Sequence, residues 1–215
     1  MKVHVRISCL AMLLLAAVAM APAQADGAGG PDDAVRIATD ELLGLINVHR
    51  AGYRSDPEPY FAAVDESMAQ FVDYRGIARA VMAGHWSSAS EEQRDRFVRT
   101  FRHGLVRSYA RAMLEFDHRE IEVLPVAEEH VRGDRAMVRM RVTAANGRTY
   151  PLNYSMAKLD GEAWKVRNVV VNGVNLGQTY RSQFASAMRS AGGMDAVIEN
   201  WSTAPPEGLE AATDA

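Results

Sequence analysis

Apolar residues recur every three or four positions along the first part of the chain after residue 30. This spacing predicts amphipathic helices over residues 33–51, 60–68 and 73–81. Gly52 is expected to end the first helix, and Pro59 lies where the second begins. Each segment has one apolar face, as expected of helices that cover a core.

A fourth, longer helix is predicted over residues 90–116. Ser90 and Gln93 match a capping box, in which each side chain satisfies an otherwise unpaired backbone N–H. At about 100° per residue, the large apolar residues from Phe97 to Phe116 fall on one side, and five arginines fall on the rest. One side is therefore predicted to be apolar and the other solvated and cationic.

The hydrophobic period changes to two from Glu120 onward. The alternation predicts four strands, over residues 121–123, 136–142, 150–156 and 164–170. Asn146-Gly147 and Asp160-Gly161 favour tight hairpin turns, because these residues tolerate positive φ. The sheet is therefore predicted to be antiparallel with its strands in sequential order.

The two ends of the chain differ from the middle. Lys2 and Arg6, an apolar run over residues 7–21 and Ala23-Gln24-Ala25 predict a signal peptide at 1–25, cleaved after Ala25. The mature protein is therefore expected in the periplasm, as a soluble exported chain. Helices are predicted again from Leu176 and from Met194. We expect one domain at 26–201 and a disordered acidic tail at 202–215.

Composition fits one globular unit, and the charge argues against nucleic acid. The chain has 215 residues, of which 48% are hydrophobic and 24% charged. Removing residues 1–25 leaves 22 Lys and Arg against 27 Asp and Glu, a formal net charge of −5. It also removes Cys9, the only cysteine. Packing without disulfides must therefore stabilise the mature fold.

Motifs for catalysis, nucleotides or metals are missing from the sequence. It has no G-x-S-x-G, H-E-x-x-H or Walker-type phosphate loop. The five mature histidines form no i,i+4 pair. Asp65, Asp73 and Asp195 are best explained as carboxylates near helix N-termini. We therefore expect no catalytic residues, no metal, no cofactor and no enzymatic activity.

Several ordered segments carry a family resemblance over residues 33–201. They include Asp73-Tyr74, Ser90-Glu91-Glu92-Gln93, Tyr150-Pro151-Leu152-Asn153-Tyr154, Trp164-Lys165-Val166, Gly173-Val174-Asn175-Leu176 and Tyr180-Arg181-Ser182-Gln183-Phe184. In this order the segments resemble the MlaC family of periplasmic phospholipid-binding proteins, also described as the toluene-tolerance auxiliary component. Ala83, Asn168 and Asn175 depart from the family pattern. A hopanoid-like cargo therefore stays open beside phospholipid.

The resemblance implies an α+β fold, with a curved four-stranded antiparallel sheet wrapped by several helices around a deep apolar cavity. The cavity would take the two acyl chains of a phospholipid and leave the headgroup outside. The partners implied are an outer-membrane lipoprotein–porin complex and an inner-membrane ABC transporter with a substrate-binding-protein-like ring. The function implied is a shuttle that maintains the lipid asymmetry of the outer membrane.

Apolar and aromatic residues of the predicted strands and helices supply a candidate lining. The lipid-binding candidates are Phe101, Leu105, Tyr109, Met113, Val138, Met140, Val142, Tyr150, Leu152, Tyr154, Val166, Val170 and Tyr180. Each of them could instead be an ordinary core residue. Arg139, Arg141 and Arg181 are candidates for a headgroup or partner contact, with a solvated surface as the alternative.

Two other classes of function remain possible from the sequence. An enzyme could use the same scaffold, with a His and a carboxylate paired inside the cavity. A structural adaptor would have helices packed solidly without an internal void. Cavity volume distinguishes the adaptor, because two acyl chains need several hundred Å³, on the order of 300 or more.

Overall fold

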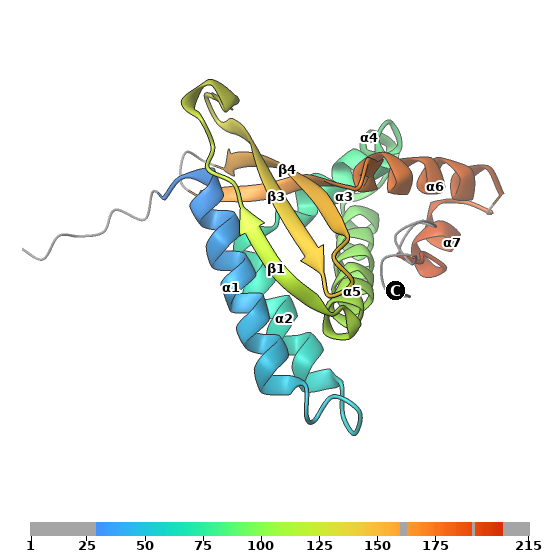
Figure 1. Cartoon of the computed structure of the whole chain (residues 1–215). Helices are drawn as coiled ribbons and strands as arrows, with labels where there is room; N and C mark the ends of the chain where they lie inside the picture. Colours follow the sequence, from blue (N-terminus) through green and yellow to red (C-terminus); the bar gives the residue numbers. More distant parts are fainter. Residues whose placement is uncertain (1–28, 160–162, 191, 204–215) are drawn as a thin grey trace, which may run out of the picture.

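The computed structural model describes residues 29–159, 163–190 and 192–203, and Figure 1 shows their arrangement. The predicted signal peptide, the Asp160-Gly161 turn and nearly all of the predicted tail lie outside these ranges. Within them, no helix combines the length and the apolar character needed to cross a bilayer.

Helices form both ends of the described fold. They are α1 Pro31–His49, α2 Glu58–Phe71, α3 Tyr74–Met82, α4 His85–Ser88, α5 Glu91–Glu115, α6 Leu176–Ser190 and α7 Met194–Glu199. All the helices that the sequence pattern predicts are present. The short α4 was not predicted, since its four residues are too few to show a period.

An antiparallel sheet lies between α5 and α6 in the sequence. Its strands are β1 His118–Val123, β2 Val131–Arg132, β3 Arg135–Ala144, β4 Thr149–Leu159, β5 Ala163–Val171 and β6 Val174–Asn175. The order is β1-β3-β4-β5-β6, and β2 pairs with β3. The α+β class and the antiparallel sheet are confirmed. The sheet has six strands where four were predicted, because two-residue strands show no alternation.

The β3–β4 hairpin turns where the sequence predicts. Gly147 has φ +84°, a left-handed conformation that glycine adopts without strain. The side-chain oxygen of Asn146 accepts a hydrogen bond from the backbone N–H of Arg148 at 2.9 Å. The turn aligns β3 and β4 so that Val138 lies opposite Tyr154. This register fixes which side chains share a face.

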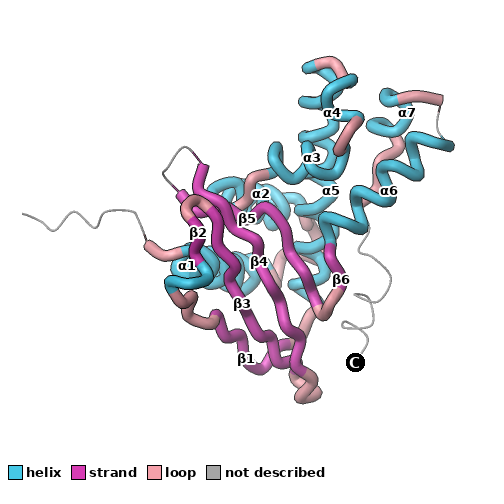
Figure 2. Tube along the Cα trace, turned by 90° about the horizontal axis from the view of Figure 1, so that it is seen from above, coloured by secondary structure: helices cyan, strands magenta, loops and turns pink. Residues whose placement is uncertain are grey.

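The helices α1, α2 and α5 lie on one side of the sheet, as Figure 2 shows. Burial along β3 follows this arrangement, because Ala136, Val138 and Met140 are buried while Met137 and Arg139 are exposed. We call the helix-covered side of the sheet the inward face and the opposite side the outer face.

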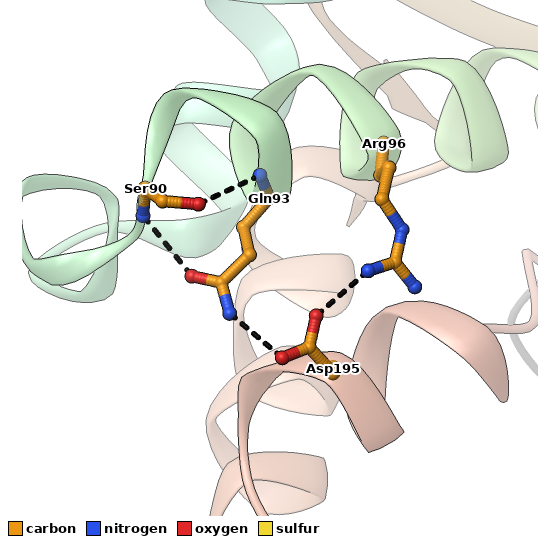
Figure 3. Close-up of polar contacts among 4 residues, drawn as sticks. All are labelled: Ser90, Gln93, Arg96 and Asp195. Atoms are coloured by element: carbon orange, nitrogen blue, oxygen red, sulfur yellow. Dashed lines mark hydrogen bonds and ion pairs between the residues drawn. The ribbon is translucent and has the colours of Figure 1, made fainter.

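The start of α5 is tied to α7 by a chain of polar contacts (Figure 3). Ser90 and Gln93 form the predicted capping box. The Gln93 side chain also donates to Asp195 at 2.9 Å, and Arg96 donates to the other carboxylate oxygen at 2.7 Å. The Asp195 carboxylate therefore links α7 to α5 through side-chain contacts. The sequence had suggested that it caps a helix instead.

The cationic side of α5 is less solvated than predicted. Arg102 forms a two-pronged ion pair with Asp65 of α2, with N–O distances of 2.6 and 2.9 Å. Arg107 forms an ion pair with Glu58, which is also in α2, at an N–O distance of 2.7 Å. Asp65 is thus a partner for arginine, not a cap. Asp73 does cap α3, accepting from the backbone N–H of Gly76 at 2.8 Å.

The buried Tyr60 yields a prediction about alkaline pH. Its hydroxyl donates to the backbone oxygen of Ala110 at 3.0 Å, and burial raises the pKa of Tyr60 from 10 to about 12. The unfolded chain therefore loses this proton first as the pH rises. Wild type should exceed Tyr60→Phe in free energy of unfolding by about 1 kcal/mol at neutral pH. We expect this advantage to shrink between about pH 10 and pH 12.

Urea unfolding of both proteins at several pH values measures this difference. If the difference in free energy of unfolding between the two proteins stayed constant from neutral pH to pH 12, the assigned burial of the Tyr60 hydroxyl would be contradicted.

Candidate functional site

Strand register places most of the predicted sheet residues on the inward face. Directly opposed residues of antiparallel strands share a face. The inward rows are Ile121–Val142–Tyr150, Val123–Met140–Leu152–Val171, Val138–Tyr154–Val169 and Ala136–Met156–Val166. The structure therefore places Val138, Met140, Val142, Tyr150, Leu152, Tyr154 and Val166 on one face, and their contact with lipid stays a prediction.

Val170 lies on the outer face. It is opposite Asn153, whose neighbour on β3 is the exposed Arg139. An irregularity between Ser155 and Met156 shifts the pairing of β4 with β5 by one residue, so the alternation of β5 changes sides there. The prediction for Val170 assumed an unbroken period of two from Val166. Val169 and Val171 take its place on the inward face.

The residues predicted from the helices divide into two groups. Phe101 and Tyr180 are buried in a cluster formed by α3, α5, α6 and α7, and their rings meet edge to face at 5.5 Å. They are core residues. Leu105, Tyr109 and Met113 of α5 are only half-buried.

The buried core is divided into three clusters. One joins the sheet to Val35 of α1, one joins α1, α2, α3 and α5, and one joins α3, α5, α6 and α7. A domain of this size normally has one contiguous core. The elements that approach the sheet closely are α1, α2, α3 and α6, whereas α5 packs closely on α2, α3 and α7.

The inward face is buried at Val138, Met140 and Tyr150, and other parts of it stay partly exposed although helices cover it. Leu152, Tyr154, Val169 and Val171 all retain partial exposure. Leu152 and Tyr154 pack against the cluster of the sheet, and Leu105, Tyr109 and Met113 of α5 pack against the helical clusters, each with part of its surface exposed.

Three tyrosine hydroxyls lie in or beside these clusters, two from helices and one from the inward face. Tyr109 and Tyr180 share a hydrogen bond of 2.9 Å, and Tyr180 donates to the backbone oxygen of Thr203 at 3.3 Å. The Tyr154 hydroxyl reaches the sulfur of Met140 at 4.0 Å. Burial raises the pKa of Tyr109, of Tyr154 and of Tyr180. All three are therefore neutral phenols at physiological pH.

The candidate arginines lie away from the inward face. Arg139 and Arg141 are exposed on the outer face, and Arg141 pairs with Glu122 at 2.7 Å. Arg181 is exposed on α6. Their positions favour a partner contact over a headgroup contact within the fold.

Among the hollows on the described surface, one has a wholly polar lining and another has a mixed polar and apolar lining. One of about 270 Å³ lies on the outer face between Glu120, Glu122, Arg141, Thr143 and Thr149. The other, of about 260 Å³, is lined by Gln183, Ala187, Asn200, Trp201 and Ser202. Neither is the apolar cavity that the sequence predicts, so that cavity stays a prediction.

The histidines show no catalytic arrangement in the described ranges. None of them forms a hydrogen bond or ion pair with a carboxylate among residues 29–159, 163–190 and 192–203. His49 packs against Tyr60, and His85 against Phe184. In the same part of the chain, no group of three His, Cys, Asp or Glu side chains is placed to hold a metal ion.

The fold and the inward face define an α+β domain whose antiparallel sheet turns an apolar, incompletely buried surface toward helices. The model of the family described as MlaC protein matches residues 36–203. The chain belongs to the MlaC family.

Two relatives match the sequence of this chain, and one solved structure shares its fold. The toluene tolerance protein Ttg2D of Pseudomonas putida is 38% identical over 91% of this chain and 90% of its own length. The intermembrane phospholipid transport system binding protein MlaC of Haemophilus influenzae is 26% identical over 65% of each chain. A phospholipid-binding protein from Ralstonia solanacearum, solved with a phospholipid, has a TM-score of 0.69 at 24% identity, covering 86% of this chain and 97% of that one.

Proposed function

We propose that this protein is a periplasmic lipid carrier that holds the acyl chains of a phospholipid between α5 and the inward face of the sheet. The observation that carries the proposal is the apolar inward face, which helices cover without burying it completely. The revised site keeps the predicted sheet residues except Val170, adds Val169 and Val171, and takes Leu105, Tyr109 and Met113 from α5.

The energetics of a lipid in water explain why such a surface is useful. At about 0.8 kcal/mol per buried CH₂, two acyl chains with about 30 methylenes represent roughly 20 kcal/mol of gross transfer free energy. A carrier must replace the bilayer with dry apolar surroundings. It needs no acid, base or metal to do so, and we accordingly propose a function without catalysis.

The relatives support phospholipid as the cargo. The Haemophilus protein is named as a phospholipid transport binding protein, and the Ralstonia protein was solved with a phospholipid bound. By extension from the family, the route runs between an outer-membrane lipoprotein–porin complex and an inner-membrane ABC transporter. Such transport would maintain outer-membrane lipid asymmetry. The exposed Arg139, Arg141 and Arg181 are candidates for contacts with these partners.

Native mass spectrometry of the protein purified from a bacterial periplasm tests the proposal. We expect a species heavier than the mature chain by the mass of one phospholipid, and organic extraction should release that lipid. A lipid-free mass together with no uptake from phospholipid vesicles would contradict the proposal. A mass increment of a polycyclic lipid would instead favour the hopanoid alternative.

A further inference from the structure

Tyr150 is a buried tyrosine whose hydroxyl has no hydrogen-bond partner in the part of the chain that the structure describes. It begins the inward face of β4, directly opposite Val142, and is 7% exposed. Its ring meets Phe116, at the end of α5, edge to face at 6.1 Å. No described residue forms a hydrogen bond with its hydroxyl oxygen, which is itself buried.

An unpaired buried hydroxyl is costly, because it has lost its hydrogen bonds to water without replacement. The typical cost is about 1–3 kcal/mol. Tyr109 of α5 and Tyr154 of the inward face differ from Tyr150. Tyr109 is hydrogen-bonded to Tyr180, and Tyr154 has the sulfur of Met140 within reach. Tyr150 thus offers a free donor to a ligand that occupies the inward face.

A cation lies against the same ring. The guanidinium carbon of Arg148 is 5.5 Å from the centre of the Tyr150 ring. Arg148 is exposed in the β3–β4 turn and has no carboxylate partner among the described residues. The two residues therefore place a dry neutral donor and a solvated cation next to each other.

A hydroxyl donor beside a cation is complementary to the region of a glycerophospholipid where the acyl chains join the headgroup. There, neutral ester carbonyls adjoin a phosphate anion. A phosphate at the buried hydroxyl would lose its hydration, whereas an ester carbonyl accepts a hydrogen bond at much lower cost. Arg148 can pair with the phosphate from the solvent side.

We propose that Tyr150 and Arg148 form a subsite for the glycerol end of a bound diacyl phospholipid, in which Tyr150 donates to an ester carbonyl and Arg148 pairs with the phosphate. This inference rests on the proposed carrier function. It fixes the polar end of the lipid near the β3–β4 turn, and it makes the site selective for ester-linked lipids.

Binding of ester and ether lipids tests the role of Tyr150. The probes are phosphatidylglycerol with two palmitoyl chains and its diether analogue with two hexadecyl chains, added to delipidated full-length mature protein. Wild type should bind the diester about tenfold more tightly, the effect of one hydrogen bond to a buried group. Tyr150→Phe should bind both lipids equally. Tyr53→Phe, in the loop after α1, should behave like wild type.

A second pair of probes tests the role of Arg148. Arg148→Gln should weaken binding of dipalmitoyl phosphatidylglycerol several-fold, roughly three- to tenfold. The same variant should leave binding of dipalmitoylglycerol, which has no phosphate, unchanged. Tyr150→Phe should weaken the binding of both lipids, because both carry ester carbonyls.

The outcomes separate this subsite from the carrier function. If wild type binds the diester and diether equally, or if Tyr150→Phe keeps the preference, the subsite is wrong and the carrier function stands. If wild type binds neither lipid, the carrier function fails. Tyr150→Phe should unfold at an unchanged or higher temperature, because it removes an unpaired polar group. A lower unfolding temperature would show that the hydroxyl already has a partner, and would overturn the subsite.

Discussion

Tyr154→Asp is expected to reduce lipid binding by more than tenfold. Tyr154 lies in the central inward row between Val138 and Val169. An ionised carboxylate placed among acyl chains costs several kcal/mol, roughly 3 or more, and each 1.4 kcal/mol corresponds to a factor of ten. Uptake of a fluorescent phospholipid from vesicles measures the effect.

Asn153→Asp provides a matched control on the same strand. Asn153 precedes Tyr154 and faces the outer side, opposite Arg139. The same charge one residue away should therefore leave uptake within about twofold of wild type, because surface substitutions have small effects. Circular dichroism should show that both variants are folded. Equal uptake by a folded Tyr154→Asp protein and wild type would show that the acyl chains bind elsewhere.

Phe101→Ala is expected to lower the free energy of unfolding by about 3–5 kcal/mol. Phe101 is fully buried, with its ring stacked on Phe97 at 5.6 Å and in edge contact with Tyr180. Removing the ring leaves a cavity among aromatic side chains that cannot collapse to fill it. Urea unfolding followed by circular dichroism measures the loss.

Arg99→Ala is the control on the same helix. Arg99 is exposed on α5, so its removal should change the free energy of unfolding by at most about 0.5 kcal/mol. The comparison tests the assignment of Phe101 to the core, where the sequence suggested a lining residue. A small stability loss for Phe101→Ala combined with lost lipid uptake would restore the lining role.

The sequence predicted those elements whose periodicity is regular and long. The α5 helix has a capping box and apolar residues at helical spacing, and it begins within one residue of the predicted start. The β3–β4 hairpin follows from Asn146-Gly147, a turn with few alternative conformations. Local chemistry determines both features, so one sequence was sufficient to predict them.

The missed features depend on tertiary contacts. Val169, Val170 and Val171 are all apolar, so their sequence shows no alternation that could reveal the shift opposite Ser155 and Met156. Core residues and lining residues are also of the same apolar types. The sequence therefore could not show that Phe101 belongs to the core and that Leu105 is only partly buried. The ion pair of Arg102 with Asp65 joins two helices whose relative register the sequence does not encode locally.

The unpaired Tyr150 hydroxyl gave no signal in the sequence. Tyrosine in a strand is common, and its hydroxyl usually finds a partner. Only the positions of its neighbours show that this hydroxyl has none among the described residues. Arg148 was likewise one arginine among 20 in the mature chain until its position against the Tyr150 ring was known.

Paramagnetic NMR with a spin-labelled phospholipid is the most direct test of where the acyl chains bind. The spin label is placed on the acyl chain, and the methyl signals of the protein are recorded. We predict strong broadening for Leu105, Leu152 and Val171, and none for the exposed Met137 on the outer face or Ile37 on α1. Broadening at Met137 with sharp signals at Leu152 and Val171 would contradict binding between α5 and the sheet.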